Sequence, residues 1–146
     1  MAASLVHMAV GQTKDVGWNI GVSKTLDHPL DRVWEFVVGP GLPLWLGEGV
    51  AFGPDAAPGD PYETADGTVG ELRGFRPADR IRLTHLVRGA DHETTVQVAM
   101  RAPAPGRTML RFHEERMLDA AEREAQRVHW QAAMERVAAA LDGHPS

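Results

Sequence analysis

Two side chains in this sequence stand where they could do chemistry inside a protein, His85 and Glu114. His85 follows Ile81 and Leu83 at intervals of two, which is the spacing of side chains on one face of a β-strand. We therefore expect His85 to point inward, where an imidazole can move a proton or orient a ligand at neutral pH. A second interpretation, which the pattern favours, is a buried histidine that bonds to a single backbone carbonyl.

Glu114 lies in the stretch RFHEERM, for which two assignments are open. If Leu110 and Phe112 face inward, Glu114 faces inward with them, and its buried carboxylate needs a partner such as His85, an arginine or a polar group of a ligand. If the strand frays here, Glu114 is solvated, and the position at the end of a strand favours this second assignment. A single β-bulge would exchange the inward and outward faces.

Other patterns that carry chemistry are weak or missing. DHE at residues 91–93 falls in an expected turn, and in HEE at 113–115 neighbouring side chains point to opposite faces, so neither triplet predicts a metal site. The sequence has no cysteine, no Gly-x-Ser-x-Gly elbow and no P-loop. We expect no metal and no cofactor. Whether the protein is an enzyme stays open, and the sequence favours a protein that is not one.

Composition excludes several classes of protein. A chain of 146 residues is long enough for one domain. Its formal charge is −5 and its arginines are scattered along the chain, which predicts no nucleic-acid partner. No apolar run approaches the roughly eighteen residues of a membrane span, and residues 1–15 do not resemble a signal peptide. We expect no membrane association and, with no cysteine present, a cytoplasmic location.

The hydrophobic pattern predicts an α+β domain over residues 16–143, preceded by a flexible leader at residues 1–15. The expected elements are a strand at 16–26, a helix ending at Gly39, a helical turn at 43–46, a loop at 47–61 with a short strand at 50–52, five meander strands at 62–64, 68–76, 81–88, 93–102 and 108–117, and a long final helix.

The two longer helices carry recognisable start signals. Asp27 or His28 is the expected cap of the first, with Pro29 in its first turn. Asp119 and Glu122 form a capping box for the last helix, which Gly143 ends. The last helix has one apolar face, made of Trp130, Met134, Val137 and Leu141.

Four stretches resemble the START-like (SRPBCC) superfamily, and specifically homologues of the activator of the heat-shock chaperone ATPase. They are HPLDRVWEFVVGPGLPLWL, GELRGFRPADRIRLTH, GRTMLRFHEE and HWQAAMERVAAAL, and the resemblance spans roughly residues 17–141. The resemblance implies a helix-grip fold, in which a curved antiparallel sheet of six to seven strands wraps a long C-terminal helix, with two short helices after the first strand. It also implies a hydrophobic cavity between that helix and the sheet. It implies little about function, because members of the superfamily range from lipid binders to cyclases and co-chaperones.

Inward-facing residues would line this cavity. Trp34 is expected in the core. Trp45 follows the Gly-Pro-Gly segment at residues 39–41 that ends the helix, and it is expected either in the core or at the mouth of the cavity. An ordinary packed core is the alternative for the whole set. The expected ligand-binding residues are Trp45, Tyr62, Leu83, His85, Val96, Val98, Phe112, Glu114, Trp130 and Met134, with Met100 beside them.

The leading hypothesis is the non-enzymatic binding of a hydrophobic or amphipathic small molecule, whose polar end His85, Tyr62 and Glu114 would orient. The first alternative is a cyclase-like enzyme of natural-product synthesis or a protein that sequesters a toxic metabolite. The second is a co-chaperone that stimulates a chaperone ATPase, with the chaperone as partner. The sequence does not indicate the ligand or the oligomeric state.

Overall fold

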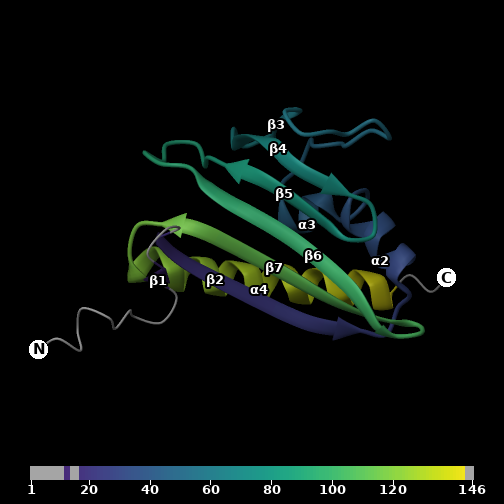
Figure 1. Cartoon of the computed structure of the whole chain (residues 1–146). Coiled ribbons are helices and arrows are strands. Elements are labelled where there is room, and N and C mark those ends of the chain that lie inside the picture. The colour runs from purple at the N-terminus through teal and green to yellow at the C-terminus, as the bar shows by residue number, and fades with distance from the viewer. Residues whose placement is uncertain (1–11, 14–16, 144–146) are drawn as a thin grey trace, which may run out of the picture.

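A curved antiparallel sheet with helices on one face forms the protein (Figure 1), as seen in a computed structural model that describes residues 12–13 and 17–143. In chain order the elements are β1 (Gln12–Thr13), β2 (Gly17–Leu26), α2 (Leu30–Val37), α3 (Leu42–Trp45), β3 (Pro61–Glu63), β4 (Val69–Arg76), β5 (Arg80–His85), β6 (Thr94–Ala104), β7 (Arg107–Met117) and α4 (Ala120–Asp142).

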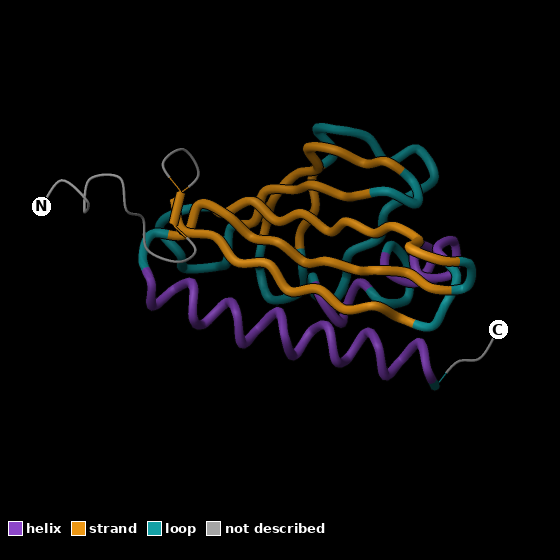
Figure 2. Tube along the Cα trace, turned by 60° about the horizontal axis from the view of Figure 1, so that its bottom comes forward, coloured by secondary structure: helices purple, strands orange, loops and turns teal. Residues whose placement is uncertain are grey.

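The strand order is β1-β2-β7-β6-β5-β4-β3, and every neighbouring pair is antiparallel. Strands β3 to β7 are a meander, and the first long strand, β2, closes the sheet beside the last one. Helix α4 runs along one face of the sheet below β2 and β7 (Figure 2), and α2 and α3 lie on the same face. This arrangement confirms the expected helix-grip fold.

Both longer helices bury an apolar face. Val33, Trp34 and Val37 of α2 are buried. In α4 the four residues of the expected apolar face are buried, and the side chain of Asp119 accepts a hydrogen bond from the backbone N–H of Glu122. None of the described helices is long and apolar enough to cross a membrane.

Three local expectations are wrong. Pro29 occupies the N-cap of α2 without a side-chain cap, because Asp27 pairs with Arg107 and the His28 ring bonds to Asp142 at the far end of α4. Residues 50–52 form no strand. Strand β5 ends at His85 rather than at residue 88, since beyond it the chain forms only a single bridge, between Leu86 and Val69.

The expected leader, residues 1–15, lies outside the described residues except for Gln12–Thr13, which pair with β2. The expected domain boundary at residue 143 coincides with the end of α4, where Gly143 is the C-cap. The unity and independence of this domain remain predictions.

Candidate functional site

A buried carboxylate lies in the middle of the otherwise apolar layer between the sheet and α4. Glu114 is 2% exposed. Its Oε1 accepts hydrogen bonds from Trp130 Nε1 at 2.8 Å and from Gln126 Nε2 at 2.7 Å, and its Oε2 accepts one from Thr94 Oγ1 at 2.6 Å. The partners are all uncharged side chains. Burying a carboxylate on neutral donors alone is costly, so this position is a candidate for function.

The inward direction of Glu114 follows from the register of β7. Leu110 and Phe112 are fully buried, and Glu114 continues their alternation. A register shift separates the pair Trp18–Met117 from the pair Ile20–Glu114, and Arg116 has a φ of 72° there. The irregularity therefore comes after Glu114 and does not reverse the inward face. The expectation of a solvated Glu114 is wrong, and in the described part of the chain neither His85 nor an arginine bonds to it.

Tyr62 and His85 form the second half of the site. Tyr62 Oη donates to the backbone oxygen of Thr84 at 2.6 Å and lies 3.2 Å from His85 Nδ1. His85 is the register partner of Thr94, whose hydroxyl bonds to Glu114. His85 points inward as expected, but its described hydrogen bond goes to a phenol and not to a backbone carbonyl.

The backbone at Gly70 brings Tyr62 to this position. Gly70 is the register partner of Tyr62, and the tyrosine ring lies directly over it. A Cβ at this position would be 2.7 Å from the ring and 2.0 Å from the Thr84 oxygen. Only glycine leaves room for both contacts.

The site perturbs its own titratable groups. Burial lowers the pKa of the His85 imidazole, and the negative charge of Glu114 opposes this shift. Burial, followed by the charge of Glu114, raises the pKa of the Tyr62 phenol. A neutral imidazole beside a neutral phenol and a carboxylate can exchange hydrogen bonds with a ligand without first losing a proton.

A pH dependence of stability follows from the lowered pKa of His85. In the unfolded state the His85 imidazole binds a proton near pH 6.5, and in the folded state it does so only at lower pH. The free energy of unfolding is therefore highest above pH 6.5 and decreases as the pH falls from 6.5 towards the lowered pKa of the folded state. We expect the unfolding free energy of His85→Asn to depend less steeply on pH below 6.5 than that of the wild type, by a slope that corresponds to at most one bound proton. Urea unfolding at several pH values measures it, and unchanged slopes would contradict it.

The structure brings all the expected ligand-binding residues to the layer between the sheet and the helices. All except the half-buried His85 are nearly or fully buried. The Phe112 and Trp130 rings stack with centroids 5.0 Å apart, and the Trp45 ring lies 6.0 Å from Phe112. These side chains fill the centre of the layer themselves.

Trp45 belongs to the core and not to the mouth of a cavity. It is 2% exposed, and its Nε1 donates to the backbone oxygen of Val37 at 2.9 Å. The turn after α2 folds the tryptophan back under the sheet. Trp34 is buried as expected, edge-on to Phe75 at 5.4 Å.

Four surface depressions in the described part of the chain lie away from this layer, and another lies at its edge. Four are on the outer face of the sheet, and a fifth of about 470 Å³ lies between β2 and α4, where Met134 is one of its lining residues. Of the expected ligand-binding residues, Met134 is the one that these five depressions reach.

Sequence reasoning missed Thr94 and Gln126, which hold the two oxygens of Glu114. Gln126 precedes Trp130 by four residues, so the two donors share one face of α4. That spacing was a usable signal, provided that Glu114 was already placed inward. Thr94 had no such signal, because its contact depends on the register between β6 and β7.

No protein-family model and no curated protein matches this chain. Solved structures do match it. CalU16 from Micromonospora echinospora has a TM-score of 0.72 at 17% identity, over 89% of this chain and 79% of that one. DynU16, a protein of the dynemicin biosynthetic locus, has a TM-score of 0.69 at 20% identity, over 85% of this chain but only 47% of that one.

PFC0360w, an HSP90 activator from Plasmodium falciparum, has a TM-score of 0.56 at 16% identity, over 71% of this chain and 76% of that one. At these identities the likenesses show the fold alone. The helix-grip fold that the resemblance implied is thus shared with these solved structures, among them an HSP90 activator.

Proposed function

We propose that the protein binds an amphipathic small molecule without transforming it, between the sheet and α4, with the polar end of the molecule at Glu114 and His85. The observation that carries the proposal is the buried Glu114 carboxylate on three neutral donors. An apolar core of this size needs no such group for folding, and buried polar clusters in apolar layers are typical of ligand sites.

Two nitrogen atoms of the cluster, Gln126 Nε2 and His85 Nε2, can form hydrogen bonds with a ligand. Gln126 is only half-buried on α4, so its amide can leave Glu114 Oε1 for a hydroxyl or ammonium group of a ligand. His85 Nδ1 faces Tyr62, and in the described part of the chain no hydrogen bond is made by Nε2. The polar end of the ligand would therefore carry a donor for Glu114 and a group that bonds to imidazole.

Entry requires the loop at residues 47–60 to move, because side chains fill the layer below it. The ends of the loop are held by Ala65 N–H to Glu48 O at 2.8 Å and by Gly59 N–H to Leu72 O at 2.7 Å. Between them, Phe52 packs edge-on against Tyr62 and Phe75, with centroids 6.4 and 6.1 Å away. Phe52 thus packs against Tyr62, at the edge of the polar cluster.

Phe52→Ala is expected to loosen this cover. It should lower the free energy of unfolding by about 1–2 kcal/mol through lost apolar burial. It should also accelerate hydrogen exchange at the Trp130 indole N–H by several-fold, since that group donates to Glu114 in the cluster that opening of the loop would expose to water. NMR exchange rates measure this, with Asp55→Ala at the exposed loop tip as control. Equal Trp130 rates in both variants would show that the loop is not the entry.

Indole resonances provide the test of binding. In ¹⁵N-labelled protein titrated with a library of amphipathic metabolites, a ligand at Glu114 must shift the Trp130 indole signal in a saturable manner. The Trp45 indole, bonded to Val37, is the internal control. The same ligand should lose affinity in His85→Asn. A Trp130 signal that no library member moves would overturn the proposal.

Two other outcomes distinguish the alternatives. A ligand recovered in chemically altered form would indicate a cyclase-like enzyme, which the DynU16 locus makes worth testing. A complex with a purified chaperone, in the absence of any ligand, would indicate the co-chaperone function named for PFC0360w. We further propose a cytoplasmic location, since the sequence contains no cysteine.

A further inference from the structure

Arginines gather on the outer face of the sheet, opposite the helices. These arginines are scattered along the sequence, and the fold brings them onto one face. Seven arginines line the four depressions of this face: Arg73, Arg76, Arg80, Arg82, Arg101, Arg111 and Arg116.

Strand alternation explains the gathering. Inward, buried residues alternate with outward arginines along the strands, as Ile81 and Leu83 do on either side of Arg82. Neighbouring strands lie about 4.8 Å apart, so outward arginines of adjacent strands come together. Arg76 and Arg80 are register partners across the turn between β4 and β5.

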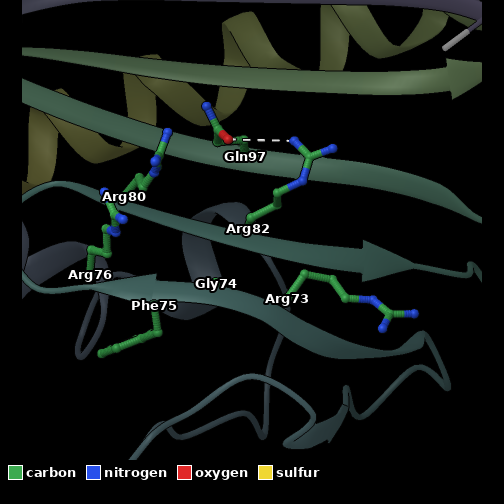
Figure 3. Close-up of a pocket in the computed structure, with 7 residues that line it drawn as sticks. All are labelled: Arg73, Gly74, Phe75, Arg76, Arg80, Arg82 and Gln97. Carbon is green, nitrogen blue, oxygen red and sulfur yellow. Dashed lines mark hydrogen bonds between the residues drawn. The ribbon is translucent and has the colours of Figure 1, made fainter. Parts of the chain in front are cut away.

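The depression over β4, β5 and β6 has a volume of about 430 Å³ (Figure 3). Arg73, Arg76, Arg80 and Arg82 line it together with the Gln97 amide, whereas the Phe75 ring points away from them. None of the described residues that line it is acidic. An adjoining depression of about 650 Å³ shares Arg73 and Arg82.

The positive charge of this depression is only partly balanced. Arg73 and Arg82 have carboxylate partners, Glu71 at 2.9 Å and Glu115. Asp79 is 3.8 Å from Arg76, a loose pair. For Arg80 the described residues include no ion-pair partner. Like charges directly opposite each other on neighbouring strands destabilise a sheet, so an anion between Arg76 and Arg80 would stabilise this one.

We propose that this depression is a binding site for a small oligophosphate, a ligand with two or more linked phosphate groups. Guanidinium groups form paired hydrogen bonds with phosphate oxygens, and arginine serves this better than lysine. Gln97 adds an amide donor, although it also accepts from Arg82 Nη1 at 3.4 Å. The site lies on the face of the sheet opposite the proposed small-molecule site and does not depend on it.

The overall charge favours a small anion over a macromolecular one. The protein carries −5, so a long polyanion would also face repulsion from the rest of the surface. A small ligand senses only charges within a Debye length of about 8–10 Å. The described residues lining the four depressions include no tyrosine or tryptophan on which nucleic-acid bases could stack.

Calorimetric titration with sodium tripolyphosphate tests the proposal, with ionic strength held constant by sodium chloride. The wild-type protein should bind one tripolyphosphate saturably, and its thermal midpoint should rise relative to chloride alone. Arg80→Gln and Arg76→Gln should each weaken binding by at least about tenfold. Arg127→Gln, on the exposed side of α4, makes the same charge change and should alter affinity less than about twofold.

Circular dichroism and the thermal midpoint establish that each variant is folded. Unsaturable binding, or equal loss in Arg127→Gln and Arg80→Gln, would mean that only net charge is sensed and would overturn the site. Binding of single-stranded DNA without binding of tripolyphosphate would overturn it as well and would assign the face to nucleic acid. No binding of either probe by the wild-type protein would leave the proposal without support and reject it.

Discussion

Glu114→Gln is expected to lower the free energy of unfolding by about 1–3 kcal/mol, although the two side chains have nearly the same shape. The carboxylate accepts three hydrogen bonds, from Trp130, Gln126 and Thr94. A glutamine offers one oxygen and one NH₂ group, and the NH₂ group would face a donor. If that donor is Thr94, its hydroxyl must turn to the His85 backbone oxygen 3.4 Å away, and the bonds from Trp130 and Gln126 lose their charged acceptor.

Denaturant unfolding at pH 7 measures the loss. Glu35→Gln is the matched control because Glu35 is exposed on α2, and it should change stability by less than about 0.5 kcal/mol. Equal stability of Glu114→Gln and the wild type would mean that the cluster is not closed as described.

A compensated variant separates stability from function. Replacing the whole cluster by apolar residues, with Glu114→Met, Thr94→Val, Gln126→Met and Trp130→Phe, removes donors and acceptor together. Such replacements are frequently neutral or stabilising. We expect this variant to recover most of the stability lost in Glu114→Gln while losing any ligand that the wild type binds. If it stays as unstable as the single variant, the cluster serves the fold itself.

Gly70→Ala is expected to cost about 3 kcal/mol or to prevent folding. The new methyl group would lie 2.0 Å from the backbone oxygen of Thr84 and 2.7 Å from the Tyr62 ring, so β3 and β5 would have to separate from β4. Truncating the ring by Tyr62→Leu should not rescue the variant, since the closer of the two clashes is with backbone.

Gly74→Ala, four residues along the same strand, is the control. There a Cβ would meet nothing closer than Arg82 Cβ at 3.7 Å, an ordinary contact. We expect it to be neutral or slightly stabilising, because alanine reduces the freedom of the unfolded chain. Thermal unfolding of the two variants compares them directly, and similar losses at both positions would contradict the packing described around Tyr62.

Local patterns in the sequence predicted most of the elements and the α+β class, whereas the helix-grip fold was expected from the family resemblance. Periods of two and of about 3.6 residues report which side of a strand or helix is buried, and burial follows from hydrophobicity along the chain itself. The apolar face of α4, the capping role of Asp119 and the meander were predicted for this reason, and the structure confirms them. The cap of α2 was wrong because Asp27 and His28 find partners distant in sequence.

The sequence predicted only part of the candidate site. Alternation along β5 and β7 pointed His85 and Glu114 inward, but not to the partners that they have. Those partners, Tyr62, Thr94 and Gln126, come from β3, β6 and α4, and their approach depends on register and on the space above a glycine.

By itself, then, the sequence determined the apolar faces of the longer strands and helices and the order in which these elements follow, because those properties are local. Tertiary structure alone decided that Glu114 is closed in by neutral donors, that Trp45 lies in the core, and that arginines distant along the chain share one face. Each of these depends on which strands become neighbours, and strand pairing joins residues far apart in sequence.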